Sequence, residues 1–263
     1  MNPEKYRITD CHIHPAAVEA EDTCWFLPSG TMQHQIDTLR RCGISRACGS
    51  VIRRFGSGVD GFDEIRALND RALSLRDRFP DFYVPGIHIH PHFPDESCRE
   101  IERCCAEEGV RWIGELVGYM MGYGEDYTTE GALAVFRTAA ACGAVVNFHC
   151  SSLDVIEKLC AAVPDLALVL AHPGNGKSVI LDRLALVAGY PNLHMDISGS
   201  GIDRYGVLRT VIDTAGKEKV LFGTDYPINN PAVYVYGSLL EPLSGEERTA
   251  LFGGNFMRLV RQP

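Results

Sequence analysis

The sequence predicts a (β/α)8 barrel, and three observations lead to this expectation. Short apolar runs alternate with helix-like stretches along the whole chain, giving eight strand–helix units. The runs are continuously apolar, which is typical of parallel strands covered on their helical side. Several runs also end in a histidine or a carboxylate. In a (β/α)8 barrel, functional side chains collect at the carboxyl ends of the strands.

The elements follow one another in a regular order. Apolar runs bounded by turn residues predict strands over Tyr6–Ile13, Ser45–Ile52, Phe82–His90, Arg111–Val117, Ala144–His149, Ala167–His172, Leu193–Ile197 and Val220–Thr224. Longer mixed patterns predict helices over Met32–Cys42, Phe62–Phe79, Glu96–Glu108, Glu130–Cys142, Leu153–Val163, Val179–Ala188, Arg204–Ala215 and Gly245–Val260. Nothing resembles a linker or a repeat, so residues 1–263 are expected to form one domain.

Three longer irregular stretches are expected at one end of the barrel. They are Pro15–Ser29, Gly118–Thr129 and Pro227–Gly237, and they follow the first, fourth and eighth strands. Loops that follow strands lie on the same side as the strands' carboxyl ends. We therefore expect these stretches to cover the mouth where functional side chains collect.

The composition narrows the classes of partner. With 46% hydrophobic and 22% charged residues, the chain is an ordinary globular protein. A formal net charge of −9 argues against nucleic acid or an anionic membrane as partner, while an anionic small molecule stays compatible. The apolar runs are too short to cross a bilayer. Scattered cysteines and an N-terminus without a secretory signal favour the cytoplasm.

The first expected strand ends in Asp10-Cys11-His12-Ile13-His14. Because side chains alternate along a strand, His12 and His14 share one face with Asp10. Imidazole suits zinc and similar ions, and Asp10 could orient a ligand from one pleat below. Two histidines meeting by chance are the alternative, but their place before a long loop favours a metal site.

Later strands each add one donor to the same mouth. Glu115 follows an apolar run, where an unpaired carboxylate is costly; it either forms a structural salt bridge or bridges two ions. His149 and His172 end the fifth and sixth strands, and each is either a buried core histidine or a ligand. Asp225 ends the eighth strand, where it can hold a metal and accept a proton from water. Donors from separate strand ends predict a divalent metal site.

The segment Ala171–Ser178 supports a different hypothesis. Its sequence Ala-His-Pro-Gly-Asn-Gly-Lys-Ser satisfies a relaxed phosphate-loop pattern between a strand and a helix, as in a nucleotide-binding NTPase. However, Pro173 removes a backbone N–H that a phosphate cradle would use, and the first glycine is missing. We keep this as a minor alternative.

A second histidine series lies at the third expected strand. His88, His90 and His92 alternate there, with Pro91 interrupting the strand. A second metal site is one alternative for this series. We favour substrate contact or core hydrogen bonding instead.

Several residues near the expected mouth are candidates for substrate contact. Arg53 and Arg54 end the second strand and could meet a substrate carboxylate, or could be solvated surface charges. Tyr119 and Tyr226 lie on segments that should border the mouth. The resulting candidates are Arg53, His90, Tyr119 and Tyr226.

Taken in order, these motifs resemble the amidohydrolase superfamily, specifically its amidohydrolase-related (amidohydrolase 2) branch. The resemblance covers nearly the whole chain and rests on Asp10–His14, Asn69–Asp70, Pro80–Gly86, His149, Ala171–Gly174, Gly223–Pro227 and Gly254–Leu259. It implies that a divalent metal, usually zinc, is held by His12, His14, His149 and Asp225. His172 would hold a second ion or steer the attacking water.

The resemblance leaves the number of ions open. Many relatives with two ions carry a carboxylated lysine at the fourth strand, where this sequence has Glu115. A glutamate there is similar to the TatD-like and some phosphotriesterase-like branches. One or two ions are therefore expected.

The resemblance also implies a function. A metal-activated water would cleave an amide, ester or lactone of a small molecule, with Asp225 taking the proton and His172 orienting the water or stabilising charge. Nonoxidative decarboxylases of aromatic or unsaturated acids share the family, so a carboxy-lyase on the same metal site is the alternative. A metal-binding protein without catalysis is a third class. Many relatives form dimers or larger oligomers.

Overall fold

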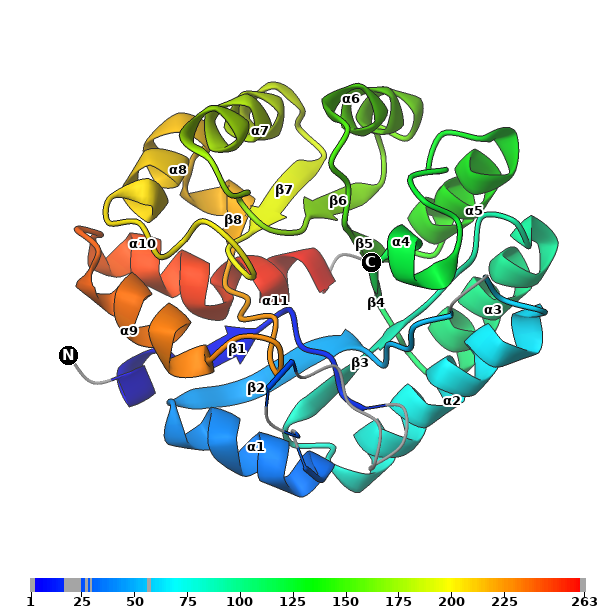
Figure 1. Ribbon diagram of the computed structural model, residues 1–263, viewed down its shortest axis with the longest axis horizontal. Coiled ribbons are helices and arrows are strands. Elements are labelled where there is room, and N and C mark those ends of the chain that lie inside the picture. Colours follow the sequence, from blue (N-terminus) through cyan, green and yellow to red (C-terminus); the bar gives the residue numbers. More distant parts are fainter. Residues whose placement is uncertain (1–2, 17–24, 27, 29, 56–57, 261–263) are drawn as a thin grey trace.

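The computed structural model describes residues 3–16, 25–26, 28, 30–55 and 58–260. Eight parallel strands follow one another in chain order and form the predicted (β/α)8 arrangement, with helices around the sheet (Figure 1). The strands are β1 (Ile8–Asp10), β2 (Ile44–Ser50), β3 (Tyr83–Ile87), β4 (Trp112–Leu116), β5 (Val145–Phe148), β6 (Ala167–Leu170), β7 (Leu193–Asp196) and β8 (Val220–Leu221).

The helices lie between the strands and after the last one. They are α1 (Met32–Arg41), α2 (Phe62–Arg78), α3 (Pro94–Glu107), α4 (Gly118–Met121), α5 (Glu130–Ala141), α6 (Leu153–Ala162), α7 (Lys177–Gly189), α8 (Val207–Ala215), α9 (Pro231–Leu240), α10 (Gly245–Thr249) and α11 (Asn255–Val260). Threonine or serine side chains cap α1, α5, α6 and α10, which satisfies N–H groups of the first turn. No described helix has the length and apolar character to span a membrane.

The sheet closes where the segments after β1 and β8 meet. The backbone N–H of Asp225 donates to the carbonyl of His12 at 2.8 Å, and the N–H of His14 donates to the carbonyl of Tyr226 at 2.8 Å. These bonds fix the histidines that follow β1 beside the aspartate that follows β8.

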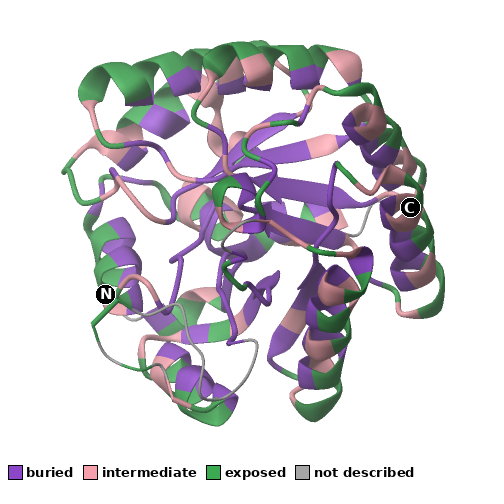
Figure 2. Cartoon of the chain, turned by 45° about the vertical axis from the view of Figure 1, so that its right-hand side comes forward, coloured by how far each residue is buried: buried purple, intermediate pink, exposed green. Residues whose placement is uncertain are grey.

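One end of the barrel is closed by the last helix. α11 crosses the barrel (Figure 1) and packs Phe256 against Trp112, at the start of β4, with the ring centroids 5.3 Å apart. The strands are mostly buried, while the helices expose their outer faces (Figure 2). Because α11 covers the amino-terminal end, the opposite end, where the strands finish, is left for chemistry.

The structure corrects several expected boundaries. Pro227–Gly237 is not irregular throughout, since α9 begins at Pro231: Asn230 accepts a hydrogen bond from the N–H of Ala232, and proline suits a first helical position. Gly118–Thr129 likewise contains α4. Much of the expected loop Pro15–Ser29 lies outside the described residues.

Two expected helices are also shorter than predicted. The helix expected from Arg204 begins only at Val207, because Gly206 adopts φ 87°, a left-handed conformation that glycine permits. The helix expected over Gly245–Val260 divides into α10, a π-helical turn (Ala250–Gly254) and α11, with Gly253 at φ 156° interrupting it. The first strand begins at Ile8 because a 3-10 turn occupies Pro3–Tyr6.

Candidate metal centre

Six predicted side chains come together at the carboxyl end of the barrel. Glu115 lies within β4, and the others follow the ends of β1, β5, β6 and β8. Four of the six are buried, and the histidines after β5 and β6 are partly exposed. The set is His12, His14, Glu115, His149, His172 and Asp225.

Four of these donors surround one point, which we call the first half-site. The Nε2 atoms of His12 and His14 are 3.2 Å apart, and they lie 3.1 and 3.2 Å from Oε2 of Glu115. Oδ1 of Asp225 lies 3.3 Å from Nε2 of His14 and 3.8 Å from Nε2 of His12. Donors about 2.1 Å from a shared tetrahedral ion are about 3.4 Å apart. The observed separations match that geometry.

The other oxygen of the same carboxylate faces a second half-site. Oε1 of Glu115 lies 3.3 Å from Nδ1 of His149 and 3.4 Å from Nε2 of His172. Glu115, His149 and His172 thus form a second group whose donor atoms lie within 4.8 Å of one another. Glu115 stands between two donor sets, with one oxygen directed to each.

The donor set fits divalent cations. Nδ1 of His14 is buried and has no hydrogen-bond partner among the described residues, and the buried Oε1 of Glu115 lies beside ring nitrogens of His149 and His172 at 3.3 and 3.4 Å. A buried carboxylate is costly unless it is paired or binds a cation, and a bound cation would remove that cost. Four imidazoles and two carboxylates are also the ligands that zinc and related ions take in proteins.

The electrostatics of the centre favour positive charge. Burial alone would lower the pKa of His14, but hydrogen bonds to Asp225 and Glu115 outweigh it and raise that pKa to about 9. Burial would raise the pKa of Glu115, but the charge and hydrogen bonds of His12, with those of His14 and His149, hold it well below its usual range. The same negative potential that holds protons on these histidines would attract metal ions.

Sequence analysis missed a carboxylate that supports both half-sites. Asp196, the last residue of β7, is fully buried, and its Oδ2 lies 2.9 Å from Nδ1 of His12. Its Oδ1 accepts a short hydrogen bond from the hydroxyl of Ser198, which lies 3.0 Å from Nδ1 of His172. Asn147 donates to Oδ2 of Asp196 at 2.9 Å. Each of the two histidines therefore presents its Nε2 to the centre.

Asp10 supports the centre through the backbone. Its Oδ1 accepts hydrogen bonds from the N–H groups of His12 at 3.0 Å and Thr224 at 3.1 Å, and its Oδ2 accepts one from the Thr224 hydroxyl at 2.5 Å. It therefore ties the segment after β1 to the segment after β8. The imidazole of His12 is oriented by Asp196 instead.

Two predicted substrate-contact residues, Tyr119 and Tyr226, lie next to donors of the metal centre. The Tyr119 ring lies 5.5 Å from the His149 ring, and the guanidinium of Arg54 lies 5.8 Å from the Tyr119 ring centroid. Tyr226 follows Asp225 and lines a cavity of about 360 Å³ together with Trp25 and other residues.

The other two candidates lie differently. The guanidinium of Arg53 lies 5.8 Å from the Phe55 ring, not over Tyr119. His90 is buried, with Nε2 3.2 Å from the carbonyl of Met121 and its ring against Tyr123. Their roles in binding stay predictions.

The rest of the histidine series does not join the donor set. His88 is fully buried, and burial lowers its pKa to about 4. His92 lies 2.9 Å from Asp126 in an exposed pair. Among the described residues, no metal-type group of three includes His88, His90 or His92.

The family to which the chain belongs was tested by comparison with protein-family profiles. The family profile described as amidohydrolase matches residues 9–262, which is nearly the whole chain. This chain belongs to the amidohydrolase family. No match to a curated protein was found.

Solved structures share the fold of this amidohydrolase at low sequence identity. The 2,6-dihydroxybenzoate decarboxylase from Rhizobium is 16% identical with a TM-score of 0.76, covering 97% of this chain and 98% of that one. The 5-carboxyvanillate decarboxylase from Novosphingobium aromaticivorans, complexed with manganese, is 13% identical with a TM-score of 0.77, and each chain is covered completely. A dihydroxybenzoic acid decarboxylase from Polaromonas with bound manganese is 17% identical, with a TM-score of 0.75 and coverage of 97% and 96%.

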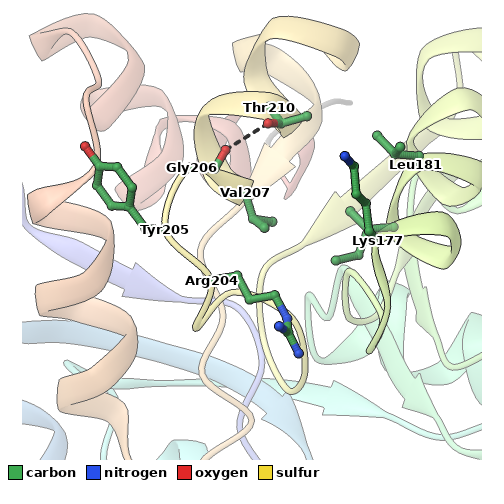
Figure 3. A pocket seen from close by; sticks show the side chains of 8 residues that line it. Lys177, Leu181, Arg204, Tyr205, Gly206, Val207 and Thr210 are labelled. Atoms are coloured by element: carbon green, nitrogen blue, oxygen red, sulfur yellow. Dashed lines mark hydrogen bonds between the residues drawn. The ribbon is translucent and has the colours of Figure 1, made fainter.

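The phosphate-loop alternative loses its support in this family context. Lys177 is the first residue of α7 and lines a cavity of about 320 Å³ between α7 and α8, with Arg204 on the opposite side (Figure 3). None of the six donor side chains lines this cavity. His172, within the same segment, faces Glu115 instead. We therefore interpret Ala171–Ser178 as the segment between β6 and the start of α7 that carries a donor of the candidate metal centre.

Proposed function

We propose that this amidohydrolase is a two-metal hydrolase that cleaves an amide, ester or lactone of a small molecule. The observation that supports this most is the position of Glu115. Its Oε2 faces His12 and His14, while its Oε1 faces His149 and His172. One carboxylate shared by two donor sets would let two ions bind side by side, as two-metal hydrolytic sites do.

Each side chain of the centre has a defined task in this proposal. His12, His14 and Asp225 would hold one ion, and His149 and His172 the other, with Glu115 between them. Ions bound there would act as Lewis acids and make water nucleophilic at neutral pH. Asp225 takes the proton of the attacking water, and Asn229 holds it in place by donating to its Oδ2 at 3.0 Å.

The same donors support a proposal for the identity of the metal. Four imidazoles favour zinc, whereas similar solved structures contain manganese. We propose zinc, because imidazole donors outnumber carboxylates at the centre. Elemental analysis of protein purified without chelator tests this.

Decarboxylation is the second candidate, and the comparisons favour it over hydrolysis. The solved structures reported above are named as decarboxylases of hydroxylated aromatic acids. The same side chains would hold a metal ion that binds the substrate carboxylate, while the bond between the carboxyl carbon and the ring carbon breaks. The electron pair stays on the ring carbon, which takes a proton from Asp225 or His172, and carbon dioxide leaves. The bridging position of Glu115 is the reason that we place hydrolysis first.

One set of assays separates these functions. Zinc-loaded and manganese-loaded protein is incubated with esters, lactones and amides, and in parallel with hydroxybenzoic acids while carbon dioxide is measured. We expect wild type to hydrolyse a substrate of the first set and to bind two equivalents of metal. In Glu115→Gln, kcat/KM should fall at least about 100-fold, and one equivalent of metal should be lost. The Asp126→Asn variant, which changes an exposed carboxylate, should match wild type. Carbon dioxide release without hydrolysis would establish the second candidate instead.

A further inference from the structure

We propose that Arg54 binds an anionic group of the substrate at the rim of the metal centre. The substrates would then be small molecules with a carboxylate or similar anionic group beyond the bond that is cleaved. This inference rests on the proposed function and narrows its substrate class.

Arg54 and Tyr119 form a path from the rim to the centre. The Tyr119 ring, 60% exposed, lies 5.5 Å from the ring of His149, a donor of the second half-site. The guanidinium of Arg54 lies 5.8 Å from the Tyr119 ring centroid. A substrate held at the centre would therefore extend along Tyr119 toward Arg54.

The backbone fixes this arrangement. The N–H of Phe55 donates to the carbonyl of Met120 at 2.9 Å, so the segment after β2 is tied to α4, which carries Tyr119. The neighbouring side chains then diverge, with Arg53 over the Phe55 ring and Arg54 over the Tyr119 ring. Arg54 thus contacts the ring that lies beside His149.

The charge of Arg54 is not neutralised within the described residues. Its contact there is the face of Tyr119, and no carboxylate pairs with it. A guanidinium that stacks on an aromatic ring keeps its N–H edge available for a bidentate bond to a carboxylate. In a chain with net charge −9, such a cation beside the mouth would select anionic substrates locally.

Binding of matched aromatic ligands tests the inference without requiring turnover. Isophthalate is compared with 3-carbamoylbenzoate, and terephthalate with 4-carbamoylbenzoate, by calorimetry on metal-loaded protein. Both members of a pair keep one carboxylate for the centre, and only the dicarboxylate carries a second charge. We expect the dicarboxylate of at least one pair to bind about ten-fold more tightly to wild type.

Variants assign this preference to a residue. Arg54→Gln should reduce the preference to about two-fold or less, while the control Arg99→Gln, which changes an exposed arginine of α3, should keep it. Circular dichroism confirms that both variants are folded. The inference is overturned if wild type binds neither dicarboxylate preferentially, if Arg54→Gln keeps the preference, or if Arg99→Gln loses it equally.

The outcomes also separate this inference from the proposed function. A preference that depends on Arg54, without hydrolysis of any ester, lactone or amide, would support the inference and contradict the hydrolase. Hydrolysis without a preference that depends on Arg54 would support the hydrolase and contradict the inference.

Discussion

At the scale of single residues, the two half-sites share one support. Asp196 contacts His12 directly and reaches His172 through Ser198. A carboxylate or hydroxyl on the second ring nitrogen fixes which nitrogen faces a metal, and its loss commonly costs 10- to 100-fold in metal affinity. One buried carboxylate thus couples the orientation of ligands in both half-sites.

We predict that Ser198→Ala weakens the second ion more than the first. His172 loses its hydroxyl partner, whereas His12 loses the Ser198 hydroxyl at 2.9 Å but keeps Asp196, so the affinity of the second ion should fall about ten-fold or more. Asp196→Asn should weaken both ions. Calorimetric titration of metal-free protein measures both affinities, with Ser151→Ala, which changes an exposed side chain, as control. Equal weakening of both ions in Ser198→Ala would contradict the prediction.

The sequence predicted the converging donors but not Asp196. His12, His14, Glu115, His149, His172 and Asp225 were found because histidines and carboxylates end apolar strands, and the barrel brings strand ends together. Asp196 lies one residue before the end of the expected strand Leu193–Ile197, so a search for carboxylates near strand ends could have found it. The stacking of Arg54 on Tyr119 was not predictable, because it depends on how two loops pack.

At the scale of elements, α7 holds the ends of β5 and β6 through one buried arginine. The guanidinium of Arg183 donates to the carbonyls of Cys150 at 2.8 Å, Ala171 at 3.2 Å and His172 at 2.8 Å. These carbonyls belong to the segments that carry His149 and His172. Arg183 therefore holds both segments of the second half-site.

We predict that Arg183→Met lowers the free energy of unfolding by about 2–4 kcal/mol, because three carbonyls lose a charged donor while the apolar stem is largely kept. Arg183→Met should also lower the affinity of the second half-site for its ion. Urea denaturation and metal titration measure the two effects. Lys177→Met, at the exposed start of the same helix, should change neither by much. An unchanged second ion in Arg183→Met would show that Arg183 stabilises the fold without positioning the site.

Element boundaries were less predictable than element types. Each expected strand and most expected helices exist, since apolar periodicity records which residues are buried. α9 was missed because Asn230-Pro231 was interpreted as loop sequence, although asparagine as cap and proline at the first position also begin a helix. Gly206 and Gly253 end or interrupt helices through conformations that periodicity does not record.

At the scale of the whole molecule, the topology could be predicted from the sequence because each strand pairs with a strand that is its neighbour in the chain. Each strand pairs with the next strand in the chain, from β1 to β8, so the order of the units gives the order of the sheet. The two ends of the barrel differ in role. α11 packs against the amino-terminal end, whereas the donors line the carboxyl end. The stability of the fold can be tested away from the metal centre.

Acid stability offers such a test. His194 on β7 is buried, with Nδ1 3.3 Å from the carbonyl of Leu168. Burial, and then the charges of Lys219 and Arg258, lower its pKa from 6.5 to about 4. Between these values the unfolded chain binds a proton that the folded chain does not. The free energy of unfolding therefore falls as the pH drops through this window, by about 2 kcal/mol from this residue between pH 7 and pH 4.5.

We predict that His194→Gln removes that contribution, because glutamine does not titrate. Urea denaturation with chelator present, at pH 7 and pH 4.5, should show the variant losing about 2 kcal/mol less than wild type on acidification. The difference between the proteins isolates His194, because every other titrating group is common to both. His34→Gln, which changes an exposed histidine, should lose as much as wild type. If His194→Gln and wild type lose equal stability, the imidazole binds its proton over the same pH range in the folded and the unfolded chain, and its burial does not disfavour the charge.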